Sequence, residues 1–125
     1  MEHYTKAQED FVEALLMLEE SKQPLETTRV ANLLHVSKPA VHQMGHELIN
    51  KGLITRIDYG DMALTAKGRE LAEKVLSRHK SIKAYLMAIG VEEKTAEHDC
   101  CLIEHCLSDE TFQALVKELE AKKAA

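Results

Sequence analysis

Apolar residues recur along this chain at steps of three and four, the spacing that places them on one face of a helix. Near the start, Phe11, Leu15 and Leu18 repeat in this way, and Pro24 then interrupts the pattern because proline disfavours helix in the residue before it. The same spacing predicts helices over about residues 5–20, 28–34, 37–51, 65–89, 92–107 and from 108 onward. The expected fold is therefore mainly α.

The second and third predicted helices are short, and a turn of three residues from His35 to Ser37 separates them. Ser37 is a favourable N-cap, Pro39 suits a first helical turn, and Gly52 is a natural helix stop. Two short helices joined in this way are typical of a helix-turn-helix, whose second helix enters the DNA major groove with its N-terminal residues.

Two short runs of strand-forming residues, 53–57 and 62–65, follow and flank the turn sequence 58–61, as in the wing of a winged helix. Any three-helix cap with a hairpin gives this pattern without binding DNA, so the charge distribution is decisive. The chain carries a net charge of −5, yet residues 29–69 hold six Lys/Arg against three Asp/Glu, whereas both flanking segments are acidic. A locally basic surface is what phosphate attraction requires, which favours DNA binding.

The remaining helices predict an all-helical dimerisation lobe, because a long helix leading out of a winged helix is a common way to build a dimer. We expect a DNA-binding domain over residues 1–70 and a helical metal-binding and dimerisation domain over residues 71–125. No apolar run is long enough to span a membrane and no signal peptide precedes the first helix, so we expect a cytoplasmic protein without a membrane partner.

The candidate chemistry lies in the helix predicted over 92–107, where Cys101, Glu104 and His105 share one face at positions i, i+3 and i+4. A thiolate, a carboxylate and an imidazole together match a divalent transition-metal site. Alternatively, Cys101 is a small buried residue and the other two are surface groups. The acidic pair Asp10 and Glu13, also at helical spacing, favours the metal interpretation.

Over about residues 5–120, the sequence resembles the diphtheria toxin repressor and manganese transport regulator family. The motifs that carry this resemblance are Glu9-Asp10-Phe11-Val12-Glu13, Ser37-Lys38-Pro39-Ala40-Val41, Leu64-Thr65-Ala66-Lys67-Gly68, Arg78-His79 and Cys101-Leu102-Ile103-Glu104-His105-Cys106-Leu107-Ser108. The resemblance implies a homodimeric, metal-activated repressor that binds a double-stranded DNA operator and controls metal-uptake genes, with no small organic ligand.

By position, the resemblance assigns Asp10, Cys101, Glu104 and His105 to the metal, with Glu13 and His79 as further ligands. The two acids match the manganese branch of the family and Cys101 matches the iron branch, while Lys83 departs from the acidic ligand expected at an ancillary iron-branch site. Because thiolate favours later metals than manganese, we expect Fe(II) as the effector, Mn(II) as the next choice, and Zn(II) or Co(II) as ions that bind in vitro.

For DNA, the family pattern places six residues near the duplex, and the wing adds Arg56 as a seventh. They are Thr27, Thr28, Ser37, Pro39, Ala40, Gln43 and Arg56. Gln43 is expected to read a base directly because its amide can pair with adenine, whereas Ser37 and the threonines are expected to contact phosphates.

Two other classes of function compete with a metal-activated repressor. One is a metal-independent winged-helix regulator that senses oxidants through Cys100, Cys101 and Cys106, although adjacent cysteines form a strained disulfide. An odd number of cysteines within seven positions also argues against a disulfide framework, and we expect Cys100 and Cys106 to be small buried residues. The other class is a metalloenzyme, which we do not expect because no nucleophile or glycine-rich phosphate loop accompanies the ligands.

Overall fold

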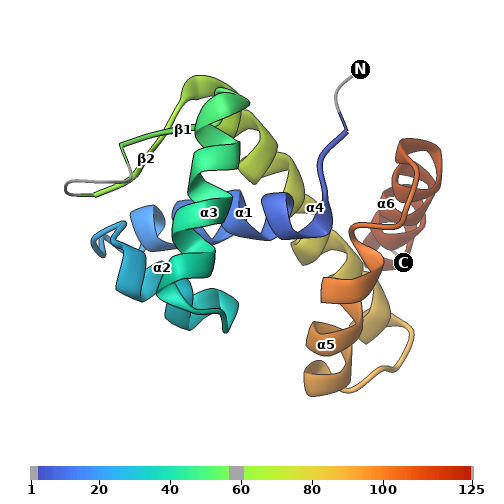
Figure 1. Ribbon diagram of the computed structural model, residues 1–125. Helices are drawn as coiled ribbons and strands as arrows, with labels where there is room; N and C mark the ends of the chain where they lie inside the picture. Colours follow the sequence, from blue (N-terminus) through green and yellow to red (C-terminus); the bar gives the residue numbers. More distant parts are fainter. Residues whose placement is uncertain (1–2, 57–60, 125) are drawn as a thin grey trace. The chain divides into compact units, whose positions relative to one another are not determined.

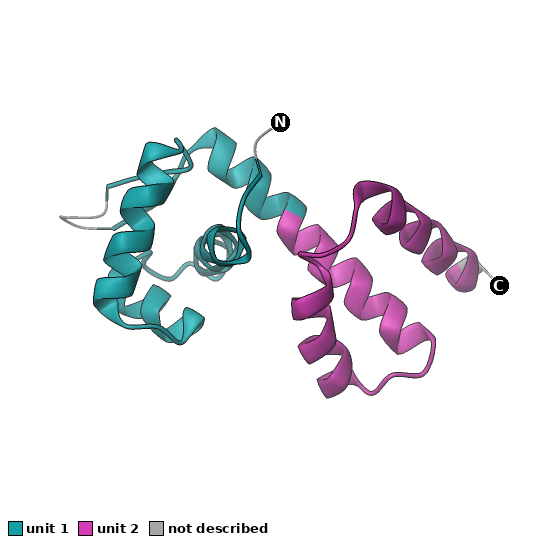
Figure 2. Cartoon of the chain, turned by 45° about the vertical axis from the view of Figure 1, so that its right-hand side comes forward, with its two compact units in different colours: residues 1–74 teal, residues 75–125 magenta. Residues whose placement is uncertain are grey.

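The computed structural model describes residues 3–56 and 61–124, and it divides into two compact units, residues 1–74 and 75–125 (Figures 1 and 2). The elements are α1 (Lys6–Glu20), α2 (Thr27–Leu34), α3 (Lys38–Asn50), β1 (Ile54–Thr55), β2 (Ala63–Leu64), α4 (Ala66–Ala88), α5 (Glu93–Ile103) and α6 (Asp109–Ala124). The mainly helical fold class, with an N-terminal winged helix-turn-helix and a helical C-terminal unit, is confirmed. None of the helices in the described part of the chain is long and apolar enough to cross a membrane.

Helix α1 supplies much of the core of unit 1 (residues 1–74). Thr5 caps its start, accepting a hydrogen bond from the Gln8 backbone at 3.1 Å while the Gln8 side chain accepts one from the Thr5 backbone at 3.0 Å. Phe11 and Leu15 on its inner face are completely buried. This face packs against α2 and β2, so α1 is the scaffold on which the helix-turn-helix rests.

The predicted helix-turn-helix is present as α2 and α3. His35 ends α2 in the left-handed backbone conformation, with φ 56°, and the next amide, of Val36, donates to the Ala31 carbonyl at 3.1 Å. Ser37 begins α3 as its N-cap, accepting a hydrogen bond from the Ala40 backbone at 3.2 Å. Val41 and Leu48 then bury the inner side of α3 and leave its first turn exposed.

The wing strands are shorter than the sequence predicts. β1 pairs antiparallel with β2 through only two residue pairs, Ile54 with Leu64 and Thr55 with Ala63. Residues 58–60 of the predicted turn, and Ile57 at the end of the first predicted strand, lie outside the described residues. Gly68, in the first turn of α4, closes the base of the wing, because a Cβ there would lie 1.9 Å from the Leu53 carbonyl oxygen.

Unit 2 (residues 75–125) is built from the end of α4 together with α5 and α6. Its core holds Ile82, Cys100 and Phe112, one residue from each helix. The helix predicted over 92–107 is shorter in the structure, because α5 ends at Ile103 and the next residues form a turn. The physical reason is Arg78, whose guanidinium donates hydrogen bonds to the carbonyl oxygens of Glu104 and Leu107 at 3.1 and 2.8 Å.

Arg78 also pairs with Asp109 at the start of α6, and its guanidinium lies over the Phe112 ring, 5.1 Å from the centroid. One side chain of α4 therefore fixes the connection between α5 and α6. A second correction follows from this turn: Cys106, expected to be buried, is exposed because it lies beyond the end of α5. Cys100 is fully buried, as expected.

Candidate metal centre

His79, on the part of α4 that belongs to unit 2, is the centre of a cluster of metal-binding side chains. Its Nδ1 atom lies 3.2 Å from Glu104 Oε2, 3.8 Å from Cys101 Sγ and 3.7 Å from Cys100 Sγ. Helix α5 supplies both cysteines, and the turn that follows α5 supplies Glu104. Two segments that are far apart in the sequence thus bring four donor groups together.

Glu104 connects two imidazoles. One carboxylate oxygen lies 3.2 Å from His79 Nδ1, and the other lies 3.2 Å from His105 Nε2. The Glu104 side chain is almost entirely buried. Burial raises the pKa of this carboxyl, but hydrogen bonds and charge interactions with the two histidines outweigh it, so the pKa of Glu104 is lowered. Glu104 is therefore a buried carboxylate anion.

The other ring nitrogen of His79 contacts a second carboxylate, because Nε2 lies 3.0 Å from Glu97 Oε1. The hydrogen bond with Glu104 and, to a lesser degree, the interaction with Glu97 raise the pKa of His79 to about 9 despite its burial. Lys83 lies 3.1 Å from the same Glu97 carboxylate. Lys83, which departs from the family pattern, thus forms an ion pair with Glu97.

The donor set of unit 2 fits a divalent transition-metal ion. Thiol sulfur, imidazole nitrogen and carboxylate oxygen are the ligand atoms that such ions prefer in proteins. The Nδ1 atom of His79 lies within 4 Å of Glu104 and Cys101, which is the separation expected of ligands that share one ion, and His105 joins through Glu104. Such an ion would also neutralise the negative charge that Glu104 holds in a buried position.

The six predicted ligands divide between the two units. The structure brings His79, Cys101, Glu104 and His105 together in unit 2. Asp10 and Glu13 lie one turn apart on α1 in unit 1, where Asp10 makes an ion pair with Lys6 at 2.6 Å. Their assignment as ligands stays a prediction.

Cys100 and Glu97 contact His79 but were not predicted as site residues. Glu97 lies four positions before Cys101, so helical spacing places these two residues on one face of α5, whereas the neighbouring position of Cys100 gave no such signal. The missing information was the position of His79, which comes from a different helix.

The predicted DNA contacts lie at the helix-turn-helix and the wing of unit 1. Ser37, Pro39 and Gln43 are exposed on the first turns of α3, and Ala40 beside them is half-buried. At the start of α2, Thr28 is exposed and Thr27 is half-buried. Arg56 is exposed just after β1, with φ 55°. Their roles remain predictions.

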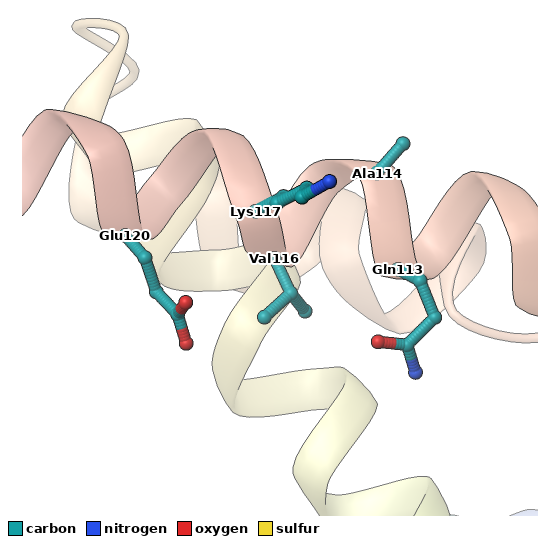
Figure 3. A pocket seen from close by; sticks show the side chains of 5 residues that line it. All are labelled: Gln113, Ala114, Val116, Lys117 and Glu120. Carbon is teal, nitrogen blue, oxygen red and sulfur yellow. The ribbon is translucent and has the colours of Figure 1, made fainter.

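A surface pocket on α6 has a different composition from the metal cluster. Figure 3 shows Gln113, Val116 and Glu120 projecting from one side of the helix, at steps of three and four, with Ala114 and Lys117 on the other side. The residues that line it include no cysteine or histidine. The pocket is therefore not the metal centre.

Comparisons with known proteins agree with the division into a DNA-binding part and a metal-binding part. Residues 3–61 match the iron dependent repressor N-terminal DNA binding domain, and residues 65–124 match the iron dependent repressor metal binding and dimerisation domain. An HTH-type transcriptional regulator of Methanocaldococcus jannaschii is 39% identical over 109 residues, covering 86% of this chain and 87% of the relative.

The transcriptional regulator MntR of Escherichia coli O157:H7 is 32% identical over 112 residues, covering 90% of this chain and 72% of its own. The structure of the manganese regulator SloR superposes with a TM-score of 0.80 at 26% identity, covering 90% of this chain and 53% of SloR. The chain thus spans about half the length of that solved relative. Together with the winged helix-turn-helix and the thiol, imidazole and carboxylate cluster, these matches show that the chain belongs to the iron-dependent repressor family of metal-dependent, DNA-binding transcriptional regulators, which are not enzymes.

Proposed function

We propose that this chain is a homodimeric repressor of metal-uptake genes that binds its operator when Fe(II) is bound, with Mn(II) as the next-best effector. The observation that carries the proposal is the cluster in unit 2, where the Nδ1 atom of His79 lies 3.2 Å from Glu104 and 3.8 Å from Cys101. A regulator that responds to metal needs such a set of donors on a DNA-binding chain, and unit 1 supplies the helix-turn-helix.

The choice of iron rests on the mixture of ligand types. Carboxylates and imidazole suit Mn(II) and Fe(II) alike, whereas a thiolate is a softer ligand and favours later metals of the series. Cys101 therefore moves the preference from manganese towards iron, and Glu104 with the predicted ligands Asp10 and Glu13 keeps it from moving to the softest ions. SloR, which resembles this chain, is described as a manganese regulator, so Mn(II) remains the natural competitor.

On the DNA side, the exposed start of α3 is the proposed reading surface. Gln43 presents an amide that can pair with adenine, and the methylene groups of Pro39 suit the methyl group of thymine. The Ser37 hydroxyl oxygen accepts the capping hydrogen bond from Ala40, which leaves its hydrogen available for a phosphate oxygen. These residues would act in pairs from the two copies of a dimer.

Coupling between metal and DNA requires that the ion stabilise the DNA-competent state more than the other state. We propose that Asp10 and Glu13 of unit 1 complete the ligand set of unit 2, so that bound metal supplies the charge neutralisation that lets these acids share one site. Moving the competent population from 1:99 to 99:1 would take about 5.5 kcal/mol of differential affinity. Several carboxylates that interact with metal in only one state can provide this amount.

The test is an anaerobic fluorescence-anisotropy titration with family-type operator DNA in the presence of chelator, Fe(II), Mn(II) or Zn(II). We expect tight binding only with metal, and we expect Glu104→Ala and His105→Ala to lose the metal response while remaining helical and dimeric. His98→Ala is the matched control, because His98 is an exposed residue of α5, the helix that leads into the turn carrying Glu104 and His105. Equal binding in chelator, or an unchanged response in both variants, would reject the proposal.

The choice of metal is tested separately by competitive equilibrium dialysis without oxygen. The wild-type chain should retain Fe(II) in preference to Mn(II), and Cys101→Asp should shift the preference towards Mn(II) because a hard oxygen ligand replaces sulfur. A clear preference of the wild-type chain for Mn(II) would overturn the iron assignment but would leave a metal-activated repressor.

A further inference from the structure

We infer that unit 2 contains a thiol-rich site in which His79, Cys100 and Cys101 together bind a thiophilic divalent cation such as zinc or cadmium. Cys100 is the new element, because neither the resemblance nor the proposed regulatory site gives it a role as a ligand. The three donor atoms, one nitrogen and two sulfurs, all lie within 4.8 Å of one another.

The two nitrogen–sulfur distances are close to those of a tetrahedral site before any ion is bound. With zinc–sulfur bonds of about 2.3 Å and zinc–nitrogen bonds of about 2.0–2.1 Å, tetrahedral angles place sulfur and nitrogen about 3.6 Å apart. His79 Nδ1 lies 3.7 Å from Cys100 Sγ and 3.8 Å from Cys101 Sγ. The ring nitrogen is therefore already at about the distance from each sulfur that two ligands of one ion would have.

The orientation of the His79 ring fits a ligand with outer-shell support. Cys101 Sγ lies 3.8 Å from Nδ1, Cys100 Sγ lies almost equally far from both ring nitrogens, 3.7 Å from Nδ1 and 3.6 Å from Nε2, and Nε2 lies 3.0 Å from Glu97 Oε1. A metal-bound histidine commonly donates its other N–H to a carboxylate, which fixes the ring and strengthens the ligand. Lys83 holds the same carboxylate at 3.1 Å and so keeps it in position.

The two cysteines differ in burial in a way that suits binding. Cys100 is fully buried in the core of unit 2 beside Ile82 and Phe112, so its position is fixed by packing. Its thiol donates to the Glu97 carbonyl oxygen at 3.3 Å, and coordination would release that proton to solvent. Cys101 is only partly buried and leaves a route for the ion. Two cysteines and one histidine with an open fourth position form a known zinc arrangement.

This thiol-rich site shares His79 and Cys101 with the proposed regulatory site, so the two ligand sets cannot hold two ions at once. That consequence rests on the proposed function, whereas the binding site itself does not. A thiophilic ion bound through Cys100 would use ligands from unit 2 alone and would leave Asp10 and Glu13 unengaged. Cys100 thus gives the chain two alternative modes of metal binding.

The test is a titration of the reduced, metal-free, full-length chain with Co(II) under anaerobic conditions, followed by displacement with Cd(II). We expect thiolate-to-cobalt charge-transfer absorption with the intensity of two thiolates. Cys100→Ala should halve this absorption and weaken Cd(II) binding roughly tenfold or more, since even outer-shell partners of metal ligands contribute roughly 10–100-fold. Cys106→Ala is the matched control, because Cys106 is an exposed cysteine outside the cluster, and it should change neither quantity.

A count of sulfur ligands on the Cd(II)-loaded wild-type chain, by X-ray absorption or cadmium NMR, keeps the test independent of the stability of Cys100→Ala. Two sulfurs support the inference, and one or none overturns it. If one sulfur is found but metal still activates DNA binding, the inference fails and the proposed function stands. If two sulfurs are found without any metal effect on DNA binding, the proposed function fails and the thiol-rich site stands.

Discussion

His79 lies between two carboxylates, and this position makes the metal-free protein sensitive to pH. Its pKa is raised from 6.5 to about 9, mainly by the hydrogen bond with Glu104. A group whose pKa is raised by folding stabilises the folded state fully below its unfolded pKa, and the contribution disappears as pH rises through the folded value. The window for His79 is therefore about pH 6.5 to 9.

We predict that the thermal midpoint of the chelator-treated chain falls between pH 6.5 and 9, and that His79→Gln falls much less over the same range. The lowered pKa of Glu104 contributes no titration there, because its stability contribution is lost only in acid. Thermal unfolding followed by circular dichroism measures the effect. His98→Gln, which changes an exposed histidine of unit 2, serves as control and should follow the wild-type curve. Parallel curves for wild type and His79→Gln would contradict the prediction.

Gly68 is a position where even a methyl group has no room. A Cβ at this residue would lie 1.9 Å from the Leu53 carbonyl oxygen, and Gly68 itself is buried. We predict that Gly68→Ala lowers the free energy of unfolding by about 1–3 kcal/mol or more, because the base of the wing must move away from α4.

The comparison is Gly52→Ala, which meets no atom within 4 Å but has φ +75°. Its cost comes from the left-handed backbone alone, about 1–2 kcal/mol. Chemical denaturation measures the loss of stability in both variants. DNA binding then distinguishes a steric from a conformational cost, because only Gly68→Ala should weaken DNA binding at temperatures where both variants are folded. Equal losses in stability and in DNA affinity would show that the contact with Leu53 has no special role.

At the scale of elements, the sequence predicted what depends on local spacing. The six predicted helices, the cap at Ser37 and the wing follow from apolar periodicity, capping residues and turn signals. The position at which α5 ends does not follow from local spacing. It depends on Arg78, which donates hydrogen bonds to the carbonyl oxygens of Glu104 and Leu107, 26 and 29 positions later in the sequence. The exposure of Cys106 follows from the same long-range contact.

The metal cluster shows the same limit of local reasoning. Helical spacing predicted that Cys101 and Glu104 lie close together, and in the structure both lie within 4 Å of the same ring nitrogen of His79. Spacing alone could not show that His79 also reaches Cys100 and Glu97, because packing between α4 and α5 decides which faces meet. The resemblance to a family supplied His79 itself.

Helix α3 should act as a recognition element whose first turns read bases. We predict that Gln43→Ala weakens binding to an operator with adenine at the contacted position by about 1–3 kcal/mol, with little effect on non-specific DNA. Anisotropy titrations against matched and single-base-substituted operators measure this difference. Asn50→Ala, an exposed change at the far end of α3, should leave the specificity unchanged. A uniform loss on all sequences would make Gln43 a phosphate contact.

At the scale of the whole molecule, the predicted ligands belong to two units that fold around separate cores. Unit 2 holds His79, Cys101, Glu104 and His105 as a connected cluster, whereas the acids of α1 belong to unit 1. A metal response of DNA binding needs a link between these units, and ligands from both would provide it. We therefore expect that binding of metal and activation of DNA binding by metal can be separated in this chain.

We predict that the double variant Asp10→Asn, Glu13→Gln still binds Co(II) through unit 2, with thiolate charge-transfer absorption retained, but loses metal-activated DNA binding. The amides keep the size of the side chains and remove the negative charge, so unit 1 should remain folded. Glu20→Gln removes an exposed acid from the same helix and should behave as wild type. Absorbance and anisotropy measured on the same samples check both halves. If the double variant is activated like wild type, α1 supplies no ligand. The metal signal would then reach the recognition helix through α4, which among the described residues is the helix that continues from unit 1 into unit 2 (Figure 2).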